Sequence, residues 1–170
     1  ASGDDLYDGF TIADLALTIA DDDTAGVRLD STSLALSEAV TATNHLQTYT
    51  VQLTSEPTAP VTITLSEEFS GDLLLEDQQQ LVITPTTLVF TAQDGNVARN
   101  VPVQAIDDSV DEDLDANVTS HAGVIRHEIT DGDQNYLALT VDSVAVAIAD
   151  DDEADVIITP PPQGFTVTEG

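Results

Sequence analysis

Val144-Ala145-Val146-Ala147-Ile148-Ala149-Asp150-Asp151-Asp152 is a strand-like sequence that ends in three consecutive carboxylates. Large aliphatic residues alternate with alanine in its first six positions, which is the period of two that a half-buried β-strand shows. The last five residues, Ile148–Asp152, recur unchanged as Ile19–Asp23. The stretch therefore predicts a strand with an acidic end, and it marks an internal repeat.

The repeat extends well beyond these five residues. At an offset of 129, residues 2–27 align with residues 131–156 without a gap, and 12 of the 26 positions are identical. A unit of 129 residues has the size of an ordinary domain. We therefore predict that 1–25 is the C-terminal end of a preceding repeat, 26–152 a complete repeat, and 153–170 the start of the next.

The period of two continues through most of the complete repeat. It is clear in His45–Thr54 and Val61–Ser66, where valine and threonine, both good strand formers, predominate. Strict alternation predicts one buried and one solvated face, as in antiparallel sheets. Asp94-Gly95 between Thr86–Ala92 and Val97–Ile106 predicts a tight hairpin. A series of such strands indicates a β-sandwich or barrel.

Two segments are less clear in the sequence. Ser33–Ala42 has a helix-like composition, but it follows the strand-like Val27–Leu29, which favours a strand. Leu73–Gln80 fits either a loop or a helical turn.

The charge balance narrows the classes of partner. The chain has 3 basic and 32 acidic residues, a net charge of −29, and no cysteine. Nucleic acids and anionic membranes are unlikely partners because both bind surplus positive charge. No stretch approaches the length of apolar residues that a membrane span needs, and no signal peptide is found. The charge itself fits either cation binding or a solvated acidic surface.

Three acidic groups stand at predicted strand ends. Asp150–Asp152 ends the last strand, Asp107–Asp115 follows the strand that ends at Ile106, and Glu38 is echoed by Glu169. In an antiparallel sandwich, alternate strand ends share a pole, so these carboxylates can crowd together. Two like charges 4 Å apart repel by about 4 kcal/mol at an effective dielectric constant near 20. Such a site either takes up protons or binds cations.

Calcium suits such a site best, because it takes 6–8 oxygen ligands in tolerant geometry. Magnesium demands stricter octahedral geometry, and zinc and copper are poor candidates without cysteine or clustered histidine. The alternative for each cluster is an ordinary solvated loop.

The acidic stretches also resemble a known family. Ile19–Val27 followed by Leu36-Ser37-Glu38 is similar to the domain junction of Calx-β modules, and Ala105–Asp113 resembles the acidic loop of the same family. Calx-β modules occur in the regulatory domains of sodium–calcium exchangers and in large extracellular adhesins. The resemblance implies an immunoglobulin-like sandwich of about seven strands. Ser70-Gly71-Asp72-Leu73 does not reproduce the Ala-Gly-x-Asp-Tyr stretch that supplies a further ligand in the family.

The resemblance also implies a set of calcium ligands. For the complete repeat these are Glu38, Asp107, Asp108, Glu112, Asp150, Asp151 and Asp152, while Asp21, Asp22 and Asp23 serve the preceding repeat and Glu169 the next.

No catalytic constellation is found, so an enzyme is not expected. His45, His121 and His127 are scattered along the sequence and are assigned structural or solvent roles. Paired carboxylates can hydrolyse glycosides, but 4% aromatic residues and no tryptophan argue against a sugar-stacking cleft. Asn117-Val118-Thr119 is a glycosylation sequon, a motif that is also common by chance.

The leading hypothesis is a calcium-binding structural or adhesive module of a long extracellular or cell-surface protein. Its partners are neighbouring repeats and, in a filament, other copies of itself, and calcium stiffens the junctions between repeats. One alternative is a calcium-sensing regulatory domain, which requires micromolar affinity. The other is a ligand-binding adhesin module that uses the loops at the pole opposite the calcium site.

Overall fold

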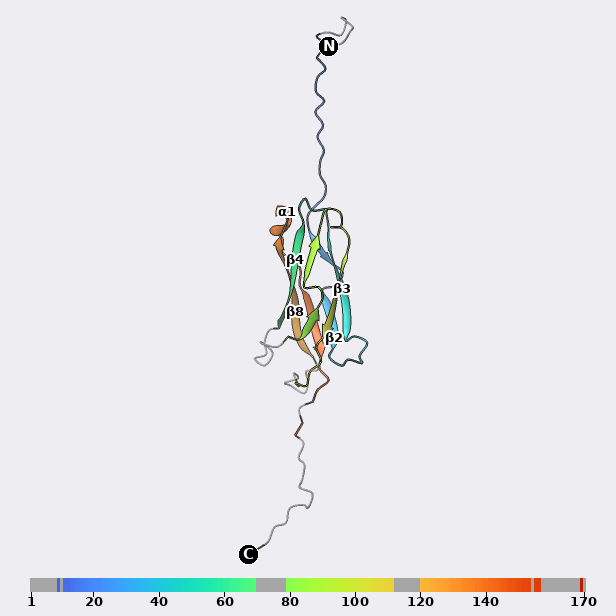
Figure 1. Cartoon of the computed structure of the whole chain (residues 1–170), viewed down its shortest axis with the longest axis vertical. Coiled ribbons are helices and arrows are strands. Elements are labelled where there is room, and N and C mark those ends of the chain that lie inside the picture. Colours follow the sequence, from blue (N-terminus) through green and yellow to red (C-terminus); the bar gives the residue numbers. More distant parts are fainter. Residues whose placement is uncertain are drawn as a thin grey trace.

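The structure, a computed structural model, describes residues 9, 11–69, 79–111, 120–153, 155–156 and 169. Within these residues it is an all-β sandwich of two sheets with one short helix (Figure 1). The four-stranded sheet has the order β1-β3-β7-β5 and the five-stranded sheet the order β2-β9-β8-β4-β6. The predicted all-β, immunoglobulin-like sandwich is confirmed.

The helix and strands have the following bounds, in chain order. They are β1 Val27–Leu29, β2 Ser33–Ser37, β3 Leu46–Leu53, β4 Val61–Phe69, β5 Leu81–Ile83, β6 Thr87–Phe90, β7 Arg99–Ala105, β8 His121–Asp131, α1 Gln134–Leu137 and β9 Val144–Ala149.

One apolar core fills the space between the two sheets. Alternate residues of the longer strands are buried, as in Tyr49, Val51 and Leu53 of β3 and in Val144, Val146 and Ile148 of β9. Burying an aliphatic side chain of this size contributes about 1.5–3 kcal/mol relative to leaving it in water. The alternation read in the sequence is therefore the pattern that forms the core.

Nine strands are described where the sequence analysis expects about seven, because two strands change sheet. β1 lies in the four-stranded sheet and β2, three residues later, in the five-stranded sheet. In the same way β5 and β6 lie in different sheets. Ser33–Ser37 is thus a strand, as favoured, and Leu73–Gln78 lies outside the described residues.

The sequence predicts an antiparallel sandwich, but one strand pair in the structure is parallel. β2 pairs in parallel with β9, with Ser33 opposite Ala145 and Ser37 opposite Ala149. The remaining strand pairs are antiparallel within the described residues. β2 can pair with the last strand in this way because the strands between them in the chain serve as the crossover connection.

The prediction of a tight hairpin at Asp94-Gly95 is wrong, because β6 and β7 do not pair with each other. β6 pairs with β4 and β7 pairs with β3 and β5, so the turn carries the chain from one sheet to the other. The Asp94 carboxylate accepts hydrogen bonds from the Thr91 amide at 2.7 Å and the Thr91 hydroxyl at 2.8 Å, and it pairs with Arg99. These bonds lower the pKa of Asp94 and stabilise a longer turn.

A buried polar pair joins the two sheets. The Tyr49 hydroxyl and His127 Nε2 lie 2.7 Å apart, and His127 Nδ1 lies 2.9 Å from the Asp142 carbonyl oxygen. Burial raises the pKa of Tyr49 and lowers the pKa of His127, so both are neutral at neutral pH. Tyr49 therefore donates to Nε2, and Nδ1–H donates to Asp142. Both ring nitrogens of His127 thus have hydrogen-bond partners, which fits the structural role predicted for this residue.

The pole at which α1 lies is closed by Gly132, Asp133 and Tyr136, which align in the sequence repeat with Gly3, Asp4 and Tyr7. The Asp133 carboxylate caps α1 by accepting from the Asn135 amide at 2.8 Å, and it also accepts from the Thr58 amide at 2.7 Å. The Thr58 hydroxyl also donates to Asp133 Oδ2, and this bond, followed by the two amide bonds, lowers the pKa of Asp133. Tyr136 is 1% exposed and its hydroxyl donates to the Ser55 carbonyl oxygen at 2.7 Å.

Gly132 supplies a backbone position that other residues cannot take. Its φ is +141°, and a Cβ there would lie 2.8 Å from the Pro60 oxygen and from the Val61 Cα. We expect Gly132→Ala to destabilise the sandwich by at least about 2 kcal/mol, because strain and overlap with backbone atoms add. Gly9 is the matched control, since its φ is +94° but nothing lies within 4 Å. Urea unfolding of both variants checks this, and equal stability of the two would contradict it.

Candidate metal centre

The parallel pair β2–β9 places two carboxylates side by side. Both strands run toward the same pole, and Ser37 is opposite Ala149 in their register. The next residue in each strand direction is Glu38 and Asp150, and the Glu38 amide donates to the Ala149 carbonyl oxygen at 3.0 Å. The pairing therefore continues just far enough to bring the two acidic side chains together.

Asp152 completes a group of three carboxylates. One ligand atom each from Glu38, Asp150 and Asp152 lies within 4.8 Å of the others. Two oxygens bound to one calcium ion at 2.3–2.6 Å can be at most about 5 Å apart, so these three oxygens fit a single ion. Glu38 is fully buried, and a buried charge of this kind requires a compensating partner.

Asp152 lies in a crowded acidic environment. Its amide donates to Asp150 Oδ1 at 2.8 Å, which forms a tight aspartate turn. Its Oδ2 is buried and accepts no hydrogen bond within the described part of the chain. Burial raises the pKa of Asp152, and the neighbouring carboxylates of Asp150, Asp151, Asp107 and Asp108 raise it further. A cation would relieve both effects.

The acidic loop approaches the same pole from the other sheet. Asp107 and Asp108 follow the end of β7, and both contribute to the pKa shift of Asp152. Asp108 Oδ1 accepts from the Val110 amide at 2.7 Å, which orders the start of the loop. Asp151 is exposed, and Glu112 and the sequon residue Asn117 lie outside the described residues. We call the group Glu38, Asp107, Asp108, Asp150, Asp151 and Asp152 the acidic pole.

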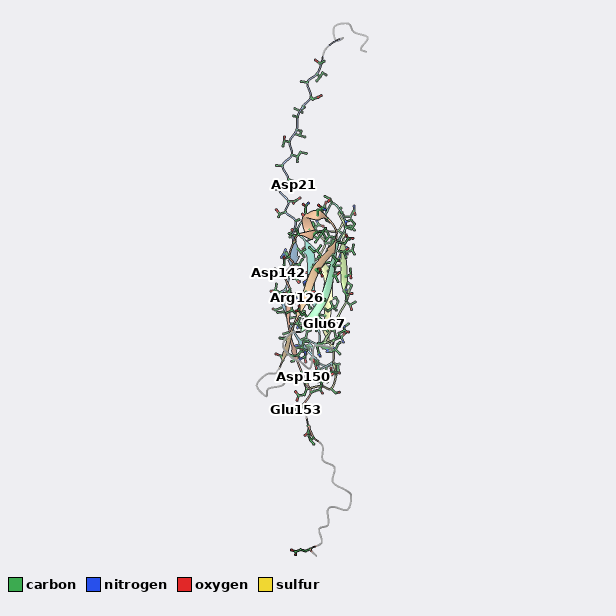
Figure 2. All side chains as sticks on the ribbon, turned by 90° about the vertical axis from the view of Figure 1, so that its left-hand side faces the viewer. Asp21, Glu67, Arg126, Asp142, Asp150 and Glu153 are labelled. Carbon is green, nitrogen blue, oxygen red and sulfur yellow. The ribbon has the colours of Figure 1, made fainter. Side chains whose placement is uncertain are left out.

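The first acidic triplet lies at the opposite end of the sandwich, where Figure 2 labels Asp21 far from Asp150. The Asp23 amide donates to Asp21 Oδ1 at 3.1 Å, the same turn that Asp150 and Asp152 form. The turn is thus a local property of the repeated sequence. Asp21 and Asp23 line a cavity of about 580 Å³ with Glu56 and Asp133. Asp22 and Glu169 are exposed and do not join the acidic pole.

Two residues at the acidic pole were not predicted. Gln80 is 1% exposed, precedes β5, and accepts a hydrogen bond from the Ile106 amide at 2.9 Å through its backbone oxygen. Its side-chain amide has no hydrogen-bond partner among the described residues. His121 is 8% exposed, and its Nε2 lies 3.6 Å from Glu38 Oε1.

The sequence contained a signal for His121 but not for Gln80. His121 and His127 are six positions apart in one strand, so the period of two puts both on the inward face, and both are buried. The prediction that these two histidines, which bracket a strand-like segment, need not share a face is therefore wrong. Gln80 follows a segment without periodicity, and only the pairing of β5 with β7 brings it beside the acidic loop.

Arginine does not neutralise this pole in the described part of the chain. Arg99, at the start of β7, pairs with Asp94, and Arg126, within β8, pairs with Glu68. Arg28 lies in β1 opposite Gln52, near the other end of the sandwich. The titratable nitrogen nearest to Glu38 is instead that of His121, at 3.6 Å.

Removing one charge from the acidic pole should stabilise the protein when no divalent cation is present. We expect Asp152→Asn to raise Tm in a chelator, because it removes a carboxylate whose ionised form is disfavoured by burial and by its neighbours. Asp151→Asn is the matched control, since Asp151 is adjacent but exposed. Thermal melts of both variants test this. A rise for Asp151→Asn as large as for Asp152→Asn would point to net charge alone.

No protein-family model and no curated protein sequence matches the chain. Solved structures do match it. The apo-form Calx CBD1 domain is 16% identical, with a TM-score of 0.50 over 76% of this chain and 100% of that one. The CupB2 chaperone of Pseudomonas aeruginosa is 10% identical, with a TM-score of 0.51 over 72% of this chain and 55% of that one.

A third structure, the calcium binding domain CBD12 of CALX1.1, is 16% identical, with a TM-score of 0.48 over 75% of this chain and 45% of that one. The likeness to the first shows a Calx-β-like sandwich fold, and the likeness to the second shows that a chaperone shares this kind of sandwich. At these identities the likeness concerns the fold alone. None of the described helices is long and apolar enough to cross a membrane.

Proposed function

We propose that this chain is a calcium-binding structural module of a tandem array on an extracellular or cell-surface protein. The observation that carries the proposal is the convergence of Glu38, Asp150 and Asp152 within 4.8 Å at the end of the parallel pair β2–β9. The donors are carboxylate oxygens, which calcium prefers, and Asp107 and Asp108 lie close enough to share its charge.

Gln80 adds a neutral candidate ligand. Amide carbonyl oxygens coordinate calcium in many proteins. The buried Gln80 amide lies next to the loop that carries Asp107 and has no hydrogen-bond partner among the described residues. We include its Oε1 among the oxygens that complete the coordination of an ion at the acidic pole.

The backbone pairing and the aspartate turn position the carboxylates of such a site in advance. The β2–β9 pairing holds Glu38 and Asp150 in place before an ion arrives, so little conformational entropy is lost on binding. The aspartate turn holds Asp152 over them. Bound calcium would offset the mutual repulsion of the carboxylates and stabilise the folded form.

Calcium should raise the stability of the folded chain, since it binds this form and not the unfolded one. We expect a gain of about 2.7 kcal/mol when free calcium exceeds Kd a hundredfold. Glu38→Gln should remove most of that gain, while Glu128→Gln, an exposed glutamate on β8, should keep it. Thermal melts in calcium and in chelator test this. Equal Tm in both media for the unaltered chain would end the calcium proposal.

The measured affinity separates a spacer from a sensor. A dissociation constant of about 10⁻⁴–10⁻³ M is typical of extracellular modules, and about 10⁻⁷–10⁻⁵ M of sensors. We expect the weaker range, and a micromolar value from isothermal titration would favour the sensor.

The second part of the proposal is that calcium stiffens the junction between repeats. Only three residues, 24–26, separate Asp23 from the start of β1. Thr54 fixes this link, because its hydroxyl donates to the Thr24 carbonyl oxygen at 2.7 Å and its amide to the Gly26 carbonyl oxygen at 2.9 Å. The end of one acidic pole therefore lies close to the next sandwich.

The junction can be tested by joining residues 1–152 directly to residues 24–170, because Asp152 and Asp23 occupy equivalent positions of the repeat. Small-angle scattering should show a longer particle in calcium than in chelator. Glu38→Gln in the first copy, whose acidic pole is at the junction, should abolish the difference. The same change in the second copy should leave it intact. The same particle length in calcium and in chelator would contradict the proposed stiffening.

A further inference from the structure

β6 is an edge strand of the five-stranded sheet, and part of its backbone faces away from the sandwich. The Leu65 amide of β4 donates to the Thr86 carbonyl oxygen at 2.8 Å, and opposite residues of an antiparallel pair alternate between bonded and non-bonded positions. Leu88 therefore directs its backbone groups toward β4, whereas Thr87 and Val89 direct theirs outward. Among the described residues, no hydrogen bond reaches these four outward N–H and C=O groups.

The opposite edge of the same sheet is protected by the chain itself. The Ala145 amide donates to the Thr32 carbonyl oxygen, so the next residue of β2 and every second one after it face outward. The three outward carbonyl oxygens, those of Ser33, Ala35 and Ser37, all accept side-chain hydrogen bonds. The donors are Ser31 for the first, Asn44 and Gln47 for the second, and His45 for the third.

The edges of the four-stranded sheet are also less accessible than β6. In β5 the Leu81 amide donates to Glu67 Oε2 at 2.9 Å, and the Leu81 carbonyl oxygen accepts from Gln79 Nε2 at 2.8 Å. β1 has only three residues, and its Val27 and Leu29 are half-buried against the core. Within the described part of the chain, β6 is thus the exposed edge without such protection.

β6 also lies in an uncharged part of an acidic chain. The sequence has no aspartate, glutamate, lysine or arginine from Gln78 to Gln93, although the chain carries a net charge of −29. Thr87 is exposed and Val89 is 49% exposed. An accessible strand edge that lacks charged side chains is a template for pairing with another strand. Two copies of this chain can meet here without placing like charges opposite each other.

We propose that β6 is an interaction surface for a second copy of this chain, whose own β6 pairs antiparallel to it about a two-fold axis at Leu88. Thr87 then lies opposite the partner's Val89, and Val89 opposite the partner's Thr87. In this register all four outward backbone groups of each copy are hydrogen-bonded, so the strand is complementary to itself.

The residues that flank the pairing leave no donor without a partner. Pro85 has no N–H, and the Thr91 amide already donates to Asp94 Oδ1 at 2.7 Å. These two positions lie opposite each other in the proposed register. The pairing therefore ends where the strand has no further outward N–H to offer.

The pairing joins the two five-stranded sheets and does not require calcium. An interface of one short strand is small, so a single pair is weak and transient. Several repeats in one chain would add their contacts and strengthen the association between two arrays.

Sedimentation equilibrium of the full chain in chelator tests the inference. The dimer fraction should rise with chain concentration and with sodium chloride, because salt screens the repulsion between two acidic copies and leaves backbone hydrogen bonds intact. A chain that stays monomeric up to millimolar concentration in high salt overturns the inference.

Two variants of Val89 test the surface. Val89→Glu should weaken the association by about tenfold or more, because the two glutamates would lie diagonally across the axis on one face of the joined sheet. Val89→Pro should weaken it to a similar degree, because it removes an outward N–H that its own sheet does not use. Thermal melts show whether each variant is folded.

Val97→Glu is the matched control, since Val97 is 50% exposed and the change adds the same charge outside β6. It should leave the association unchanged. Equal weakening by Val97→Glu and Val89→Glu would assign the effect to net charge and overturn the inference.

The unaltered chain supplies a second readout. The Thr87 and Val89 amides should exchange slowly with solvent only at high chain concentration, whereas the Leu88 amide, which is bonded to β4, should be protected at every concentration. Association that leaves the exchange of Thr87 and Val89 unchanged would place the contact elsewhere and also overturn the inference.

The outcomes separate this inference from the calcium proposal. Strand pairing in chelator without any effect of calcium on stability sinks only the calcium function. Calcium-dependent stability in a chain that does not pair through β6 sinks only the interaction surface.

Discussion

The parallel pairing of β2 with β9 is the constraint on which the acidic pole depends. Antiparallel neighbours carry their C-terminal ends to opposite poles, so Glu38 and Asp150 would be separated by the length of a strand. Parallel neighbours deliver both ends to one place, in a register fixed by five residue pairs from Ser33–Ala145 to Ser37–Ala149. The apolar faces of both strands are buried, and a slip by one residue would expose them. The core thus positions the carboxylates.

The repulsion between these carboxylates destabilises the folded state that brings them together. Glu38 is fully buried, and the pKa of Asp152 is raised by burial and by four neighbouring carboxylates. Paired arginines at Asp94 and Glu68 lie elsewhere, so the described part of the chain offers this pole no arginine. The sandwich keeps a destabilising cluster that apolar or amide side chains would avoid. A cost of this kind is typical of a binding site, where the ligand supplies the missing charge.

Much of the fold could be read from the sequence because the strand period and the core are the same pattern. The alternation in β3, β4 and β9 predicted the buried faces correctly. The turn at Asp94-Gly95 was misread, since a dipeptide indicates a turn but not whether the next strand stays in the same sheet. The pairing of β2 with β9 could not be read, because it depends on contacts more than a hundred residues apart.

The acidic residues were similarly visible only in part. Runs of aspartate are evident in the sequence, and their shared pole follows from the sandwich. Gln80 and His121 do not stand out, because each is a single polar residue whose burial depends on neighbouring strands.

The same parallel pair determines how the sandwich carries mechanical load. The described segment before β1 leaves from the pole at α1, and the segment after β9 leaves from the opposite pole (Figures 1 and 2). Tension between these ends pulls β9 lengthwise past β2, so their hydrogen bonds are loaded together in shear rather than opened one after another. An ion held by Glu38, Asp150 and Asp152 would tie the loaded end of β9 to the adjacent end of β2. The acidic pole is thus placed where a cross-link would most directly resist extension.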